Sequence, residues 1–133
     1  ILIMQINKKY LDLFFKISNF AVITLYLYPG SILGLILYGN LKLQPRLTED
    51  FFSLSSNHFY TFLILSFIAI LSYSNNSKKL DYIFLYLLLI SIILELTHLV
   101  IPNRSFQYED LIGNITGVII SYILIKIYEF IRR

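Results

Sequence analysis

The chain has 133 residues, a length that predicts one domain spanning residues 1–133. It is 57% hydrophobic and 14% charged, whereas an ordinary soluble domain carries about 25% charged residues. This composition excludes a disordered chain or a protein that coats nucleic acid, and it favours a protein embedded in a lipid bilayer. The net charge is +3, and the absence of cysteine excludes disulfides, thiol nucleophiles and cysteine-ligated metals.

The first apolar run, residues 17–38, is uncharged and spans roughly 33 Å as a helix, enough for a hydrocarbon core of about 30 Å. Pro29 and Gly30 lie in its middle, where we expect a kink. Gly30 and Gly34 form a small-xxx-small pair, which indicates either close helix contact or only the abundance of glycine in membrane helices. The run is too long for a signal peptide and no cleavage pattern follows it, so we expect it to be retained.

Three more spans are expected, at residues 56–73, 82–101 and 111–130. The uninterrupted apolar part of the first of these, residues 59–73, covers only roughly 22 Å, so we expect that helix to begin near Ser56. His58 then lies at or just inside the membrane interface. Phe51 and Phe52, in the preceding loop, are expected at the interface in an amphipathic turn. The sequence thus predicts an all-α integral membrane bundle of four helices.

Lysine and arginine residues indicate how the bundle is oriented. With four spans, one side contains the N-terminus, the second linker and the C-terminus, with Lys8, Lys9, Lys16, Lys78, Lys79, Lys126, Arg132 and Arg133. The other side holds only Lys42, Arg46 and Arg104. Because basic residues concentrate on the cytoplasmic side of a membrane, both termini are predicted to be cytoplasmic. The first and third linkers then face outward.

Ionisable side chains interrupt the third predicted span. Glu95 lies six residues before Ile101, roughly 9 Å beneath the expected outer boundary. His98 follows at i+3, on nearly the same face of the helix. A charged residue at the centre of a span costs at least about 2.5–3.5 kcal/mol, so each of these side chains requires a physical reason.

Polar and small side chains also follow one face of the last predicted helix. Their spacings of four, three and four residues, at 100° per residue, keep them within about 60° of one another; they are Asp110, Asn114, Gly117 and Ser121. The third linker and the head of the second helix add further polar residues at the same outer end. The zone so defined holds His58, Glu95, His98, Arg104, Asp110 and Asn114.

One explanation of this cluster is an outward-facing pocket for a polar headgroup. Arg104 would bind a phosphate or carboxylate with both arms of its guanidinium, and the desolvated Glu95 would act as a general acid or base. An imidazole would share that task. The candidate catalytic residues are therefore Glu95 and His58, and the candidate ligand-binding residues are Arg104, Asp110, Asn114 and His98.

The other explanation is that the same residues only hold helices together. Asp110 would cap the last helix or lie in its first turn, and Asn114 would bond across helices. Close helix packing would use three small residues, Gly113, Gly117 and Ser121. We predict that Glu95 and Arg104 approach within hydrogen-bonding or water-bridged distance, beside Asn114 or Asp110, because an unpaired buried carboxylate is costly.

A metal site is not predicted, although one pair of residues has a suitable spacing. Glu95 and His98 stand at i,i+3, as in the carboxylate-bridged metal sites of helical bundles, but the sequence holds no second such pair. We therefore expect neither a metal nor another cofactor.

The stretch ELTHLVIPNRSFQYEDLIGNITG, residues 95–117, resembles the VanZ-like membrane protein family. That family carries a Glu near the end of its third helix, then a P-x-R-S-F loop, then a D-x-x-x-N-x-x-G run that opens the last helix. The matching residues are Glu95, Pro102, Arg104, Ser105, Phe106, Asp110, Asn114 and Gly117. His58 matches a histidine at the head of the family's second helix. The sequence departs from the family where an Asp-Lys pair usually precedes that histidine, and at His98, where the family usually has Gln.

The resemblance implies a multi-pass protein of the bacterial cytoplasmic membrane that acts at the cell envelope, since the family is named for glycopeptide (teicoplanin) resistance. One hypothesis is that the protein binds or acts on a lipid headgroup, a lipid-linked molecule or a cell-wall precursor. Another is a non-catalytic subunit or scaffold of a larger membrane complex, including a homo-oligomer. A transporter is a third, which four helices without an internal repeat support poorly.

Overall fold

The computed structural model describes residues 7–74 and 76–131, which form five α-helices and no strand. Four helices are long and apolar enough to cross a membrane: α1 (Lys8–Leu27), α3 (Ser56–Tyr73), α4 (Ser77–Thr97) and α5 (Tyr108–Ile131). A short helix, α2 (Ile32–Tyr38), follows α1. The predicted all-α fold with four potential membrane helices is thus confirmed. Outside the described residues lie four parts of the predicted domain: residues 1–6, Asn75, Arg132 and Arg133.

The first membrane helix differs from the predicted span. Asn7 caps its start by accepting a hydrogen bond from a backbone N–H two residues on, and the helix ends at Leu27. Pro29 has no N–H to continue the helical ladder, and Gly30 adopts a φ of 112°, which residues with a side chain rarely adopt. The prediction of one kinked helix over residues 17–38 was therefore wrong, because this pair ends the helix instead of bending it.

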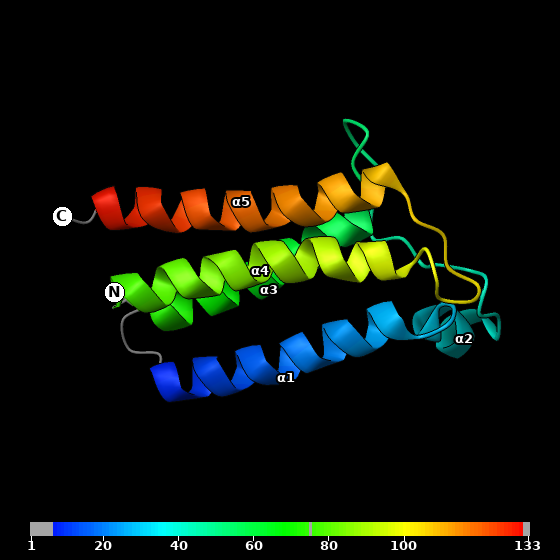
Figure 1. The fold of residues 1–133 in the computed structure, drawn as a ribbon, viewed down its shortest axis with the longest axis horizontal. Coiled ribbons are helices and arrows are strands. Elements are labelled where there is room, and N and C mark those ends of the chain that lie inside the picture. The colour runs from blue at the N-terminus through cyan, green and yellow to red at the C-terminus, as the bar shows by residue number, and fades with distance from the viewer. Residues whose placement is uncertain (1–6, 75, 132–133) are drawn as a thin grey trace.

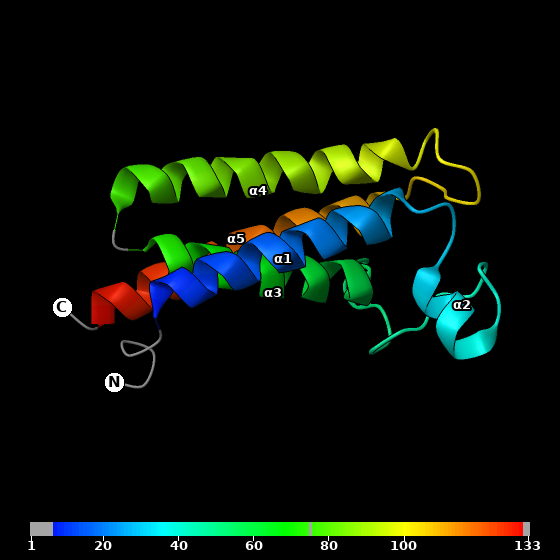
Figure 2. The same cartoon turned by 90° about the horizontal axis from the view of Figure 1, so that it is seen from below.

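The short helix α2 lies beyond the end of α1, at one end of the bundle, as Figures 1 and 2 both show. The Ser31 side chain caps it by accepting a hydrogen bond from Gly34 N at 2.9 Å. Gly30 and Gly34 pack against the backbone and side chains of residues 40–43 and not against another membrane helix. Seven residues cannot span a bilayer, and the helix leaves apolar side chains exposed: Leu33, Leu35, Ile36, Leu37 and Tyr38.

The helices α3 and α4 form a hairpin whose connection is shorter than expected. The bounds of α3 are those predicted from the sequence. Helix α4 begins at Ser77 because Asn76 caps it, accepting a hydrogen bond from Lys79 N at 3.0 Å. It ends at Thr97, so the span predicted over residues 82–101 is displaced towards the N-terminus. The apolar residues at the end of that run belong to a loop and not to the helix.

The last helix, α5, begins at Tyr108, one turn earlier than predicted. Glu109 and Asp110 consequently lie in its first turn, where a carboxylate is favoured by the positive end of the helix dipole. The loop that precedes α5 turns at Asn103, whose φ is 60°. This arrangement brings the end of α4 and the start of α5 to the same end of the bundle.

Helices α3 and α5 approach very closely along the stripe of small residues. A Cβ placed on Gly117 would stand 2.6 Å from Phe59 O and 2.8 Å from Leu63 N, both backbone atoms of α3. Gly113 meets the same helix one turn earlier, and Ser121 Oγ donates a hydrogen bond to Leu63 O at 2.6 Å. The stripe therefore faces α3. Around this contact lies an apolar core that includes Phe62, Leu65, Ala69, Leu87 and Val118.

Polar contacts attach α1 to the other helices. Tyr73, at the end of α3, donates a hydrogen bond to the Asp12 carboxylate. About two helical turns further along α1, Asn19 Nδ2 donates to Tyr86 Oη of α4 at 2.6 Å. Because many apolar side chains of α1 remain exposed, these specific contacts help to fix how the helix is rotated against the bundle.

The loop before α3 makes a tight turn at the two phenylalanines singled out above. Phe51 and Leu54 exchange two backbone hydrogen bonds, at 3.2 and 2.8 Å, around Phe52 and Ser53. Phe51 packs its ring against Phe59 of α3, with centroids 5.4 Å apart. Phe52 stands at the tip, 95% exposed. The location of this turn at the membrane interface stays a prediction.

The basic residues of the described chain divide between the two ends of the bundle. The start of α1, the α3–α4 connection and the end of α5 lie at one end in Figure 1, and α2 lies at the other. Lys8, Lys9, Lys78 and Lys79 belong to the first end, whereas Lys42, Arg46 and Arg104 belong to loops at the second. By the positive-inside rule we expect the first end to be cytoplasmic, and this orientation stays a prediction.

We therefore expect reporter fusions to reveal two cytoplasmic termini. A reporter that is active only outside the cytoplasm is expected to be silent when fused after Arg133 and active when inserted in the loop between α2 and α3. The reverse pattern would overturn the predicted orientation. Membrane accumulation of each fusion, measured by immunoblot, is the control for loss of the protein.

Candidate functional site

Three helix ends place the polar residues of the site next to one another. His58 lies in the first turn of α3, Glu95 in the last turn of α4 and Asp110 in the first turn of α5. Because neighbouring helices in this hairpin arrangement alternate in direction, these turns meet at the end of the bundle that carries α2 (Figure 2). The residues predicted from separate segments thus form one cluster.

His58 is the centre of this cluster and contacts carboxylates with both ring nitrogens. Its Nδ1 lies 3.6 Å from Glu95 Oε2, and its Nε2 lies 3.5 Å from Asp110 Oδ2. The same Nδ1 is 2.9 Å from the Tyr26 hydroxyl and 3.1 Å from Asn114 Oδ1. An imidazole surrounded by acceptors in this way is well placed to hold a proton and to release it.

Asn114 orients the groups around His58. Its Nδ2 donates to Ser91 O of α4 at 3.1 Å, which turns its Oδ1 towards the cluster. There Oδ1 accepts a hydrogen bond from the Tyr26 hydroxyl at 2.7 Å. Since the hydroxyl proton is used in this bond, His58 Nδ1 is left to act as the donor towards Tyr26 Oη or Asn114 Oδ1.

Glu95 is completely buried and incompletely paired. Its Oε1 accepts a hydrogen bond from Gln107 N at 3.2 Å. Its Oε2 has no hydrogen-bond partner among the described residues, although His98 Nδ1 lies 3.3 Å away. His98 Nε2 is 3.1 Å from the backbone oxygen of Tyr26, and a carbonyl only accepts, so the ring proton lies on Nε2. The unprotonated Nδ1 of a neutral His98 therefore faces a carboxylate oxygen.

Within the described part of the chain Arg104 makes no direct hydrogen bond or ion pair with Glu95, and the water-bridged approach that the sequence also allowed stays a prediction. The guanidinium instead caps the end of α1: Nε donates to Tyr28 O at 3.1 Å and Nη2 to Leu25 O at 2.7 Å. The physical reason lies in Pro29, which lacks the N–H that would have reached Leu25 O. The carbonyls left unpaired at the end of α1 therefore bind the Arg104 guanidinium, and the Glu95 carboxylate lies next to His58 and His98 instead.

The pKa of the Arg104 guanidinium is lowered overall in this place, but the group stays charged. Burial lowers the pKa of its guanidinium, while the nearby Tyr26, Glu95 and Asp110 raise it. The usual pKa of arginine is so high that the group remains protonated at neutral pH. A cation is also favoured by the negative end of the α1 dipole, where both carbonyls lie.

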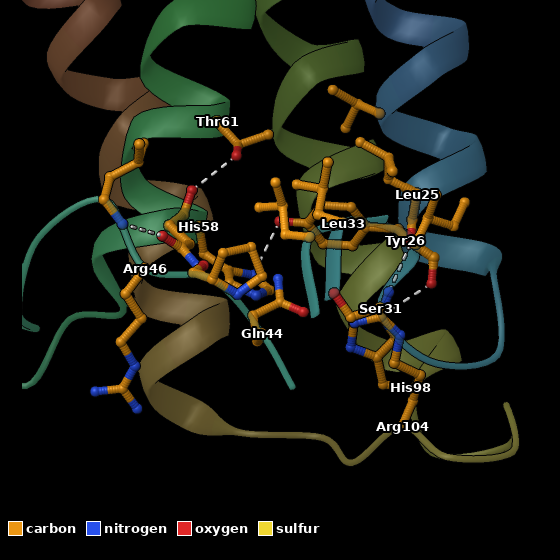
Figure 3. A pocket seen from close by; sticks show the side chains of 16 residues that line it. Leu25, Tyr26, Ser31, Leu33, Gln44, Arg46, His58, Thr61, His98 and Arg104 are labelled. Carbon is orange, nitrogen blue, oxygen red and sulfur yellow. Dashed lines mark hydrogen bonds between the residues drawn. The ribbon is translucent and has the colours of Figure 1, made fainter. Parts of the chain in front are cut away.

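A cavity of about 300 Å³ opens between α1, α2, α3 and the segment that precedes α3 (Figure 3). Its wall is partly apolar, with Val22, Leu25, Leu33 and Leu37. The ionisable side chains in the wall are Arg46, His58, His98 and Arg104, with Tyr26 beside them. Among the described residues that line the cavity there is no aspartate or glutamate, because Glu95 and Asp110 lie behind His58. Figure 3 shows His98 and Arg104 together near the end of α1.

Comparison with known sequence families identifies the family of the chain. The sequence model of the VanZ/LLP1 family matches residues 11–129, which is nearly the whole chain. The chain belongs to the VanZ/LLP1 family. Comparison with curated proteins and with solved structures gave no match.

The VanZ/LLP1 chain places the residues of the resemblance in different roles. Glu95, His58, Asp110 and Asn114 form the buried cluster, and Arg104 caps α1 beside it. Where the family usually has an Asp-Lys pair before its histidine, Asn57 binds the preceding loop, donating to Pro45 O at 2.6 Å. His98, which replaces a Gln of the family pattern, contacts the end of α1.

Sequence reasoning missed Tyr26, which joins α1 to the cluster in this VanZ/LLP1 chain. Its side chain is 7% exposed and touches His58, Asn114 and, in a stacked arrangement with rings 5.5 Å apart, His98. A buried tyrosine hydroxyl requires a polar partner, but the sequence contains 11 tyrosines. Only knowledge that α1 ends just before Pro29 would have distinguished Tyr26 from the other tyrosines.

Proposed function

We propose that this VanZ/LLP1 protein binds the anionic headgroup of a lipid or of a lipid-linked cell-wall precursor in the cavity at the outer end of the bundle. One observation carries the proposal: the cavity joins apolar walls to Arg46, His58, His98 and Arg104 and has no carboxylate among its described lining residues. Such a lining matches a molecule with a negatively charged head and an apolar tail. The exposed apolar side chains of α2 support entry of the ligand into the cavity from the membrane surface, since amphipathic helices at the interface lie at the depth of the lipid headgroups.

His58 is the group best placed to transfer a proton to or from such a ligand. It lines the cavity, and its side chain is 13% exposed, whereas that of Glu95 is fully buried. Glu95 and Asp110 contact the His58 ring on the side away from the cavity and help to orient it, as the acidic partner of a general base does. Glu95 therefore serves as a positioning residue.

Binding is tested with purified protein in detergent and added phosphatidylglycerol, followed by native mass spectrometry. We expect the wild type to retain this anionic lipid in preference to phosphatidylcholine. Arg46→Gln removes a cavity charge whose side chain is 66% exposed, so it should weaken retention without unfolding the protein. The matched control, Lys126→Gln, removes a charge from α5 outside the cavity and should bind like the wild type. Equal retention by all three proteins would contradict the proposal.

Function in cells is tested by expression in a glycopeptide-sensitive bacterium. We expect the wild type to raise tolerance of teicoplanin, and His58→Gln to abolish the gain while the protein still accumulates in the membrane. Glu109→Gln, which alters an exposed carboxylate in the first turn of α5, is the control and should remain active.

A scaffold function is favoured by a different observation. Arg104 and Asn114 bond to backbone carbonyls of other helices and so contribute to assembly of the bundle. If His58→Gln lowered the amount of protein in the membrane in parallel with tolerance, the cluster would be structural and the scaffold function would be preferred.

A further inference from the structure

We propose that His58, Glu95 and Asp110 bind a divalent transition-metal ion of the Zn²⁺ class. One ligand atom from each of these residues lies within 4.8 Å of the other two. Ligands bound at about 2.0–2.2 Å stand no more than roughly 4.4 Å apart around a metal ion. A small inward movement of the three side chains therefore completes the set. The inference does not depend on the proposed function, because metal binding is measured without a lipid. In the metal-bound protein His58 is a ligand, and the proton-transfer role proposed for it applies to the metal-free protein.

The unpaired oxygen of Glu95 points to a cation at this place. Within residues 7–74 and 76–131 no group donates a hydrogen bond to Glu95 Oε2, and the Glu95 side chain is completely buried. A carboxylate in this condition is strongly destabilised unless a positive charge compensates it. The nearest groups are ring nitrogens, His98 Nδ1 at 3.3 Å and His58 Nδ1 at 3.6 Å.

The histidines around Glu95 reinforce this argument. The proton of a neutral His98 lies on Nε2, which donates to Tyr26 O at 3.1 Å. The lone pair of Nδ1 therefore faces Glu95 Oε2, and two electron-rich atoms oppose each other at 3.3 Å. A cation between or beside them removes that repulsion.

The surroundings of His58 match those of a metal-bound imidazole. A ligating histidine usually donates its other ring N–H to a carbonyl or carboxylate, which fixes the ring. Here His58 Nδ1 lies 3.1 Å from the amide oxygen of Asn114, which is itself held by Ser91 O. This leaves Nε2, 3.5 Å from Asp110 Oδ2, as the ligating atom.

The donor set indicates which metal is expected. Imidazole nitrogen with two carboxylates suits Zn²⁺ and similar first-row ions, whereas Ca²⁺ takes six to eight oxygen ligands and Mg²⁺ keeps several waters. Three protein ligands from three helices leave a coordination position free. Because His58 lines the cavity, that position lies near the proposed ligand.

The test is metal analysis of the full-length, tag-free protein in detergent micelles. The protein is stripped with a chelator, refilled with ZnCl₂, desalted and analysed by mass spectrometry for bound zinc. We expect about one Zn²⁺ per chain in the wild type and at least a tenfold weaker affinity in Asp110→Asn, since even outer partners of a metal site change affinity by about 10- to 100-fold. Glu109→Gln is the matched control: it alters the adjacent, exposed carboxylate and should bind like the wild type.

Thermal unfolding of the same samples measures whether each variant is folded, so that weak zinc binding can be distinguished from poor folding. Zn²⁺ is expected to raise the unfolding temperature of the wild type and of Glu109→Gln, but not that of Asp110→Asn. Absence of zinc binding by a folded wild-type protein would overturn the proposal and leave a shared proton as the partner of Glu95. Unchanged zinc affinity in Asp110→Asn would overturn it as well.

Discussion

Replacing Arg104 by alanine is expected to lower the free energy of unfolding by roughly 2–4 kcal/mol, since the change leaves two partly buried backbone carbonyls without donors. These are Leu25 O and Tyr28 O, which accept bonds from Arg104 at 2.7 and 3.1 Å. The loss includes the favourable interaction of the cation with the end of the α1 dipole. Thermal or denaturant unfolding in detergent, followed by circular dichroism, measures the effect.

Two further variants separate the cap from the charge. Arg104→Lys retains the charge but cannot present two fixed donors, so we expect a stability between those of the wild type and Arg104→Ala. Arg46→Ala removes the other arginine of the cavity, whose ion pair with Asp50 spans 4.0 Å and is exposed, and should change stability by less than about 0.5 kcal/mol. Arg104→Ala that is as stable as the wild type would show that water replaces the cap.

Replacing Gly117 by alanine is expected to destabilise the bundle, although alanine favours an isolated helix over glycine by roughly 1 kcal/mol. The added Cβ would stand 2.6 Å from Phe59 O and 2.8 Å from Leu63 N. Both are backbone atoms of α3, so the two helices must move apart. Overpacking of this kind costs about 1–3 kcal/mol, and Gly117→Leu should cost more and reduce the amount of folded protein.

The matched control for Gly117→Leu is Ala21→Leu. Ala21 is a small residue of a membrane helix, but it lies on the exposed surface of α1. A comparable increase in side-chain volume, smaller by one methyl group, should therefore leave folding unchanged. Size-exclusion chromatography from solubilised membranes compares the two variants. Equal yields of Gly117→Leu and the wild type would show that α3 and α5 do not pack through this glycine.

The long helices were predictable because membrane spans depend on length and apolar composition, which the sequence states directly. The bounds of α3 follow from the length that a bilayer requires, and the facing stripe of α5 follows from helical periodicity. The exact ends of α1 and α4 were harder to predict, because they depend on single capping or helix-breaking residues. Asn76 begins α4 ahead of its apolar run, and the pair Pro29–Gly30 ends α1 within an apolar run, so hydrophobicity alone misplaced both helices.

The pairing within the site was not predictable from sequence distance. Glu95 and Arg104 are close in the chain and opposite in charge, which favoured a direct pair between them. The competing partners come from far away: the carbonyls of α1 for the arginine, and His58 for the carboxylate. Arg104 binds the carbonyls of α1 because the helix ends at Pro29 and leaves them unpaired, and this end of the helix depends on the local backbone geometry at Pro29.

The capped end of α1 has a consequence for the order in which the protein is made. Its carbonyl partners, His98 and Arg104, are 72 to 79 residues further along the chain. While α1 alone is in the membrane, the carbonyls of Leu25, Tyr26 and Tyr28 depend on water or on the insertion machinery for their hydrogen bonds. The hydrogen bonds that satisfy these carbonyls can therefore form only after the loop that follows α4 has been synthesised. The first helix to be translated is thus completed only after α4, the third of the four long helices, has been made.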